Sequence, residues 1–168
     1  IQMEIKRVGI VGMGTMGTQI GLVSARGGYQ TLMVDISKEQ IEKGWNQIKS
    51  FLNAQVKKGK LSQDEGEKIL SFIKTSTDLE EAFSDVQLVI EAVFENIEVK
   101  KEVFKKLDAI CPPETILSSN TSTLSISELG AATKRPERCI GTHFLIPAAL
   151  TPLAVSYTHL RAHETVLD

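Results

Sequence analysis

Short apolar runs alternate along the chain with longer segments whose apolar residues recur at helical spacing. The apolar runs predict buried strands at residues 6–11, 30–34, 86–92, 115–118 and 138–142. The periodic segments predict helices at residues 16–27, 38–56, 98–110 and 127–131. Strands separated by helices indicate an α/β fold, in which a doubly wound, mainly parallel sheet is covered on both faces.

Two charged helices are predicted between the second strand and the next apolar run. The first spans residues 38–56 and ends at a basic turn, residues 57–60. Ser62, with Glu65 three residues later, matches a capping box and starts the second helix. This helical pair is an insertion into an otherwise plain doubly wound pattern.

A glycine-rich segment joins the first strand to the first helix. It reads Gly12-Met13-Gly14-Thr15-Met16-Gly17, and Asp35 closes the second strand 18 residues later. In a dinucleotide-binding fingerprint the three glycines permit a tight turn, close approach of the pyrophosphate and close helix packing, in that order. The helix N-terminus then offers unpaired N–H groups to phosphates. The candidate contacts are therefore Gly12, Gly14, Thr15, Met16, Gly17 and Asp35; the alternative is a turn without a ligand.

Asp35 bears on the choice of dinucleotide. A carboxylate at the end of the second strand accepts hydrogen bonds from the adenosine ribose and repels a 2′-phosphate, so NAD is favoured over NADP. No Arg follows directly, although Lys38 is close. Asp35 also suits the N-cap of the next helix, where Ser37 competes with it, and both roles are compatible.

Composition limits the classes of partner. The chain has 168 residues, the size of one domain, and its formal net charge of −2 shows no asymmetry between blocks. This balance argues against nucleic acid or an anionic membrane as the main partner, and the apolar runs are too short to span a bilayer. Cys111 and Cys139 lack metal or redox spacing and are interpreted as free thiols, so we expect a cytoplasmic protein.

Four polar segments follow predicted strands. They are the glycine-rich segment, residues 92–96, residues 119–122 and His143. Ligands of parallel sheets bind beyond the carboxyl ends of the strands, where these segments converge. The chemistry of the protein is therefore expected at this edge.

Together these residues resemble the NAD-binding domain of the 3-hydroxyacyl-CoA dehydrogenases, a Rossmann-type fold. The resemblance covers roughly residues 4–144 and is most specific at Asn120-Thr121-Ser122 and His143. The other matching stretches are residues 8–17 (VGIVGMGTMG), 34–35, 90–96 (IEAVFEN), 100–108 (KKEVFKKLD), 118–125 (SSNTSTLS), 135–136 and 141–144 (GTHF).

The resemblance implies roles for particular residues. Ser122 would hydrogen-bond the substrate oxygen, and His143 would take the proton from the 3-hydroxyl as hydride leaves for NAD⁺. Asn120 would contact substrate or nicotinamide, and Lys57 the phosphates of CoA. The implied cofactor contacts at the end of the strand predicted at residues 86–92, and after it, are Ala92, Val93, Glu95 and Lys100.

Structural alternatives exist for these residues. Ser122 could cap the following helix, with Thr123 or Ser125 as substitutes, and His143 could be a structural histidine at a strand end. The basic turn that contains Lys57 could be a solvated surface.

The resemblance is expected to end at Phe144. Ile146 stands where the family has an asparagine, and Val155 stands where it has the glutamate that orients the histidine. Residues 156–168 are interpreted as foreign to the family, with a divergent terminus as the alternative. His159 and His163 lie four apart beside Glu164, but a third ligand is not evident and no metal site is predicted.

We therefore expect an incomplete NAD-binding domain at residues 1–145 and a tail at 146–168 with no designed place on the sheet. The last strands of the sheet and the helical, dimer-forming second domain of the family would be absent. The full-length parent would oxidise a 3-hydroxyacyl-CoA, or catalyse the reverse reaction, and the chain as given would be an inactive NAD-binding module. A β-hydroxyacid dehydrogenase of another Rossmann family is the other alternative.

Overall fold

A single sheet forms the centre of the molecule. The computed structural model describes residues 3–145 and the backbone of residues 154–158. The strand order is β3-β2-β1-β4-β5-β6-β7. The strands are β1 (Arg7–Val11), β2 (Gln30–Val34), β3 (Ile73–Ser76), β4 (Leu88–Glu91), β5 (Ile116–Ser119), β6 (Cys139–Phe144) and β7 (Ala154–Thr158). β1 to β6 run parallel and β7 runs antiparallel to β6, which confirms the predicted Rossmann-type α/β fold.

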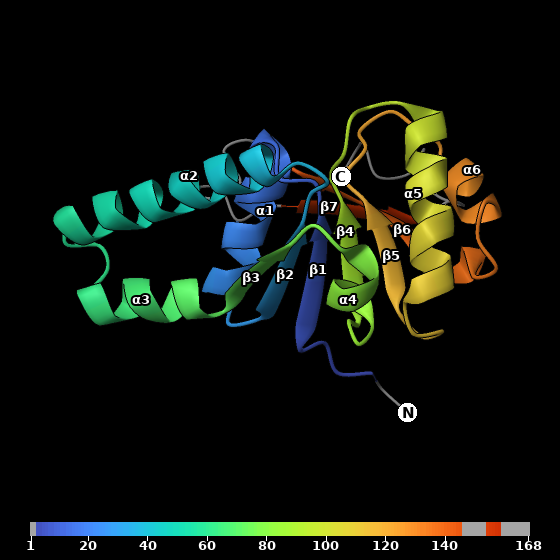
Figure 1. Ribbon diagram of the computed structural model, residues 1–168. Helices are drawn as coiled ribbons and strands as arrows, with labels where there is room; N and C mark the ends of the chain where they lie inside the picture. The colour runs from blue at the N-terminus through green and yellow to red at the C-terminus, as the bar shows by residue number, and fades with distance from the viewer. Residues whose placement is uncertain (1–2, 146–153, 159–168) are drawn as a thin grey trace.

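Helices cover both faces of the sheet (Figure 1). They are α1 (Thr15–Arg26), α2 (Lys38–Lys57), α3 (Gln63–Ser71), α4 (Leu79–Phe83), α5 (Ile97–Ile110), α6 (Ile126–Ala131) and the 3-10 helix η1 (Pro136–Arg138). α1, α2 and α3 lie on one side, and α4, α5 and α6 lie on the other. Among the described helices, none combines the length and apolarity needed to cross a lipid bilayer.

Neighbouring strand residues contribute to two separate cores because side chains alternate between the faces of a sheet. Ile10 and Met33 are 0% exposed and belong to the core beneath α1 and α2. Val11 and Val89 belong to the other core, with Phe104 of α5. The near-continuous apolar runs found in the sequence are the consequence of burial on both faces.

Side-chain caps set the starts of several helices. Ser37 accepts a hydrogen bond from Gln40 N at the start of α2, and Asn96 caps α5 in the same way. Ser62 and Glu65 form the predicted capping box of α3. The helical pair is thus confirmed, and α2 and α3 extend together away from the sheet (Figure 1).

The structure adds elements that the sequence analysis did not predict. β3 is a four-residue edge strand of sequence IKTS, and α4 has only five residues, so neither carries a readable hydrophobic period. After β3 the chain returns to β4, which pairs with the free side of β1. The strand order therefore reverses between β1 and β4, the position where open α/β sheets bind ligands.

Part of the expected tail forms a strand. β7 pairs with β6 in a register that places Val155 opposite His143. The expectation that residues 146–168 have no place on the sheet is therefore wrong for residues 154–158. The sequence AVSYT contains β-branched and aromatic residues that favour pairing with the open edge of β6. Ile146, His159 and His163 lie outside the described residues.

Candidate functional site

Two glycines of the loop after β1 are required by the packing of the protein itself. Gly12 has a φ of +97°, and its N–H donates to Val34 O at 2.8 Å. A Cβ at Gly12 would lie 2.9 Å from Ala92 O, and one at Gly17 would lie 1.8 Å from Gly12 O. Gly12 therefore makes the turn, and Gly17 lets α1 approach the loop, as predicted.

Gly14 differs from these two glycines because no protein atom crowds it. A Cβ there would have Gln40 Nε2, at 4.0 Å, as its nearest neighbour. Gly14 is the N-cap of α1, makes no side-chain cap, and no acidic residue stands in the first turn, where Thr15 is exposed and Met16 half-buried. This end of α1 thus keeps N–H groups and a positive dipole end for an external anion.

Asp35 ties the glycine-rich loop to the end of β2. Its Oδ2 accepts from Met13 N at 2.9 Å, and its Oδ1 accepts from Ser37 N at 2.9 Å. Ser37 is the N-cap of α2. The alternative interpretation of Asp35 as the cap of this helix is therefore wrong. A carboxylate has about four acceptor positions, so about two remain on Asp35 for a ligand.

A cleft of about 820 Å³ opens beside this loop at the carboxyl ends of β1, β2 and β4. Its size is in the range of sites for small molecules and cofactors. Ile36 and Phe94, 94% and 78% exposed, give it apolar walls. Of the residues predicted from the sequence, the cleft is lined by Gly12, Gly14, Asp35, Ala92 and Val93.

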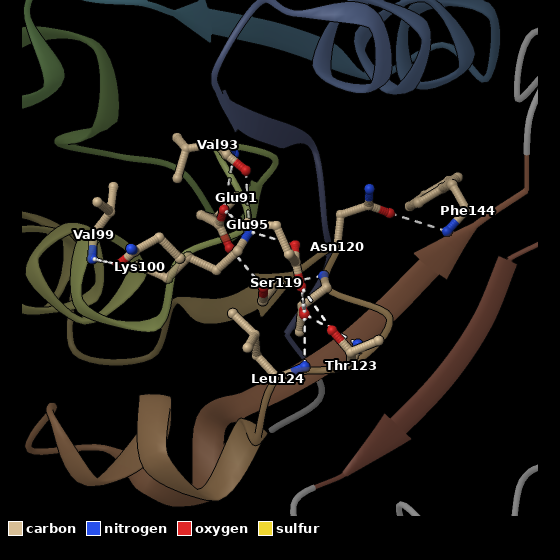
Figure 2. Close-up of polar contacts among 12 residues, drawn as sticks. Glu91, Val93, Glu95, Val99, Lys100, Ser119, Asn120, Thr123, Leu124 and Phe144 are labelled. Carbon is tan, nitrogen blue, oxygen red and sulfur yellow. Dashed lines mark hydrogen bonds and ion pairs between the residues drawn. The ribbon is translucent and has the colours of Figure 1, made fainter.

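A buried ion pair joins Glu91, the last residue of β4, to Lys100 of α5 (Figure 2). Lys100 Nζ lies 2.5 Å from Glu91 Oε1, and their side chains are 1% and 0% exposed. Nζ also lies 3.5 Å from Oε2 of Glu95, whose side chain is 45% exposed. The structure therefore places Glu95 at the surface and Lys100 beneath it. Sequence reasoning missed Glu91, although a carboxylate inside a predicted buried strand was the signal for it.

The loop after β5 brings Asn120 to the strand that carries His143. Asn120 Oδ1 accepts a hydrogen bond from Phe144 N at 3.0 Å (Figure 2). Ser122 is exposed. The alternative role of Ser122 as a helix cap is wrong, because Ser125 caps α6 by accepting from Glu128 N at 3.3 Å.

His143 is half-buried near the carboxyl end of β6. Its Nδ1 is buried and has no hydrogen-bond partner among the described residues. A buried imidazole nitrogen normally has a partner, and a catalytic histidine has one that orients it. In the β6–β7 register the position opposite His143 is Val155, an apolar residue where the resemblance predicted a glutamate.

Lys57 is not brought together with the other predicted site residues. It is exposed at the end of α2. The start of α2 contacts the glycine-rich loop through the bond from Gln40 Nε2 to Met13 O. Lys57 lies 17 positions after Gln40 in the same helix, which corresponds to about 25 Å.

The two cysteines are free, as predicted, and the structure shows that both are buried. Burial raises the pKa of the Cys111 thiol to about 11 and also raises that of Cys139. Within the part of the chain that the structure describes, no group of His, Cys, Asp and Glu residues could hold a metal ion.

Comparison with known proteins identifies relatives of the whole chain. Residues 7–167 match the family described as 3-hydroxyacyl-CoA dehydrogenase, NAD binding domain. The chain is 40% identical over 168 residues to 3-hydroxyadipyl-CoA dehydrogenase from Escherichia coli, which covers 100% of this chain and 35% of that protein. It is 42% identical over 150 residues to 3-hydroxybutyryl-CoA dehydrogenase from Mycobacterium tuberculosis, covering 89% of this chain and 52% of that protein.

A solved structure has the same fold. The crystal structure of (S)-3-hydroxybutyryl-CoA dehydrogenase from Ralstonia eutropha is 37% identical and superposes with a TM-score of 0.88, covering 97% of this chain and 59% of that one.

The chain spans about half or less of the length of the two curated relatives named above. The family match also extends beyond Phe144, where the sequence analysis expected it to end, to residue 167.

Proposed function

Because the chain belongs to the family of NAD-binding domains of the 3-hydroxyacyl-CoA dehydrogenases, we propose that it binds NAD in the cleft at the carboxyl ends of β1, β2 and β4. In a longer protein it would serve the oxidation of a 3-hydroxyacyl-CoA to the 3-oxoacyl-CoA, or the reverse reaction. We also propose that this longer protein is cytoplasmic and dimerises through its further domain.

The residues of the cleft fit NAD. The uncrowded Gly14 and the open end of α1 suit the pyrophosphate. Asp35 keeps acceptor positions that suit the hydroxyls of the adenosine ribose. The apolar walls at Ile36 and Phe94 suit the adenine ring. Bound NAD⁺ would supply the acceptor for the hydride that leaves C3 of the substrate.

The observation that carries the proposal is the bond between Asn120 Oδ1 and Phe144 N. It joins the loop that carries Ser122 to the strand that carries His143, at the same sheet edge as the cleft. Ser122 would then hold the substrate oxygen through its hydroxyl, and His143 would accept the proton of the 3-hydroxyl.

A second candidate function is that of a NAD-binding module with little or no turnover. It is favoured by the Nδ1 of His143, which has no hydrogen-bond partner among the described residues, and by Val155 in the opposite position of β7. In other histidine-based sites, loss of the orienting acid lowers turnover by roughly 10²–10⁴. This candidate concerns the 168-residue chain, whereas the first concerns the longer protein.

The reduction of acetoacetyl-CoA by NADH, followed by NADH absorbance, tests the proposal. The chain should turn over weakly or not at all, and Val155→Glu should raise its rate at least about tenfold, because it puts a carboxylate at the position that pairs with His143 in the β6–β7 register. His143→Gln in the Val155→Glu background should abolish that gain. A Val155→Glu variant that binds NADH but gains no rate contradicts the assignment of His143.

A further inference from the structure

The ammonium group of Lys100 contacts three oxygen atoms of the protein itself. Nζ lies 2.5 Å from Glu91 Oε1 and 3.5 Å from Glu95 Oε2, and it donates to Val93 O at 3.2 Å. Two of these contacts, to Glu91 and Val93, are hydrogen bonds, and the third, to Glu95, is an ion pair. Figure 2 shows the Lys100 side chain running from α5 to the two carboxylates.

Glu91 forms hydrogen bonds with the buried side of the loop after β5, residues 119–124. Its Oε2 accepts from Ser119 Oγ at 2.5 Å, and Ser119 Oγ in turn accepts from Thr121 N at 3.2 Å. The main-chain oxygen of Glu91 accepts from Asn120 N at 2.8 Å. Ser119 and Thr121 are both 0% exposed, so these hydrogen bonds are buried.

Glu95 forms hydrogen bonds with the outer side of the same loop. Its Oε1 accepts from Thr121 Oγ1 and, at 3.3 Å, from Thr123 Oγ1. Thr121 Oγ1 also accepts from Leu124 N at 3.0 Å. Ser122 therefore lies between two held residues, and the two carboxylates that hold them share one cation.

We propose that Lys100 is a positioning residue: by compensating the charges of Glu91 and Glu95, it holds the 119–124 loop, and with it Ser122 and Asn120, in place relative to His143. The roles of Ser122 and His143 rest on the proposed function, but the clamp itself does not. Removal of the Lys100 charge would leave a buried, uncompensated Glu91 and two carboxylates without a common partner.

This role differs from the cofactor contact that the sequence resemblance implied for Lys100. A side chain that is 1% exposed presents almost no surface to a ligand in the cleft, and its charge is already paired with two carboxylates of the protein. A direct contact with the ligand and the proposed charge compensation, which we call the clamp, make different predictions for the double variant Lys100→Met/Glu91→Gln. Glu91→Gln removes the charge that Lys100 must compensate, but it cannot restore a lost contact to a ligand.

Amide hydrogen exchange, followed by NMR on the ligand-free chain, tests the clamp. The variants are Lys100→Met, Glu91→Gln and the double variant. Lys105→Met is the matched control, because the ion pair between Lys105 and Glu102 at 2.8 Å lies on the same helix but is exposed. The reporter amides are those of Asn120, Thr121, Thr123 and Leu124, and the reference amides are those of Ile10 and Val11 in β1.

In Lys100→Met the reporter amides should exchange at least about 100-fold faster than in the wild type, as breaking a buried ion pair implies. The reference amides should change less than about tenfold. The double variant should return the reporter amides to within about tenfold of the wild type, and the Lys105→Met control should leave them unchanged. Equal acceleration of reporter and reference amides, or a double variant as fast as Lys100→Met, overturns the proposal.

A milder variant keeps the test decisive if Lys100→Met does not fold. Glu95→Ala removes only the contacts of Glu95, a half-exposed side chain, with Thr121, Thr123 and Lys100, and it should accelerate the Thr123 and Leu124 amides selectively. Unchanged exchange there overturns the clamp.

NADH titration of the same proteins then separates this proposal from the proposed function. Recovery of NADH affinity in the double variant supports the clamp. If the double variant binds NADH as weakly as Lys100→Met, Lys100 contacts the ligand directly and the clamp is refuted. Absence of NADH binding by the wild type would refute the proposed function and leave the exchange result standing.

Discussion

Alanine substitutions at Gly14 and Gly17 should affect different properties: Gly17→Ala should lower stability, and Gly14→Ala should weaken NAD binding. At Gly17 the new Cβ would lie 1.8 Å from Gly12 O and 2.7 Å from Gly12 C, both main-chain atoms that cannot rotate away. Overpacking of this kind costs about 1–3 kcal/mol, and we expect a loss of at least about 2 kcal/mol in the free energy of unfolding. For a chain of this size, that loss lowers the Tm by roughly 4–8 °C.

At Gly14 the new Cβ would meet only Gln40 Nε2 at 4.0 Å, and the backbone at φ −71° and ψ −165° suits any L-residue. The lower entropy of the unfolded chain stabilises the variant by about 0.4–1 kcal/mol, and the poorer N-cap offsets this. The net change in unfolding free energy should stay within about 1 kcal/mol. The methyl group, however, occupies the space through which the pyrophosphate approaches the α1 amides. NADH affinity should therefore fall at least about tenfold, or 1.4 kcal/mol.

Urea unfolding, followed by the fluorescence of Trp45, measures the stability of both variants, and titration with NADH measures the affinity of Gly14→Ala. Trp45 is the only tryptophan, and it packs against the α1–α2 core. Wild-type NADH affinity in Gly14→Ala would refute the placement of the pyrophosphate. A stability loss in Gly14→Ala equal to that in Gly17→Ala would refute the distinction between the two glycines.

Three further variants or reactions test other parts of the account. Asp35→Asn should lower NADH affinity and narrow the preference over NADPH, measured by paired titrations, and an unchanged preference would contradict the role of Asp35. Arg135→Met should lower the unfolding free energy by about 3–5 kcal/mol in urea, because Arg135 is 8% exposed and its Nε donates to Asp108 Oδ1 at 2.7 Å. The Cys111 thiol, with its pKa raised to about 11 by burial, stays protonated at pH 8. Its alkylation by iodoacetamide at pH 8 should therefore be slow in the folded chain and fast in urea, and fast labelling of the folded chain would contradict its burial.

The hydrophobic pattern predicted the strands that are buried on both faces of the sheet and the long amphipathic helices. β2 has the predicted bounds, and α2 differs from its prediction by one residue, because 20 residues with a buried stripe leave little ambiguity. β3 and α4 were missed because a four-residue edge strand with one apolar residue and a single helical turn carry no readable period. β7 was missed because its pairing depends on the open edge of β6, which no local pattern in residues 154–158 reveals.

The location of the site was predictable, but its internal bonding was not. Glycine spacing and the rule for strand ends placed Gly14, Asp35 and Asn120 at one edge, where the structure has them. Periodicity could not show that Lys100 turns inward to Glu91, because a lysine on a helix is usually solvated. That contact joins residues nine positions apart through the fold of the β4 loop, and it becomes visible only in three dimensions.

The affinity of the chain for NADH compared with NADPH tests the central claim most directly. The carboxylate of Asp35 at the end of β2 should repel a 2′-phosphate. Fluorescence titrations at the same ionic strength should show NADH binding at least about tenfold more tightly, a difference of about 1.4 kcal/mol or more. Equal affinities for the two dinucleotides, or binding of neither, would contradict the account.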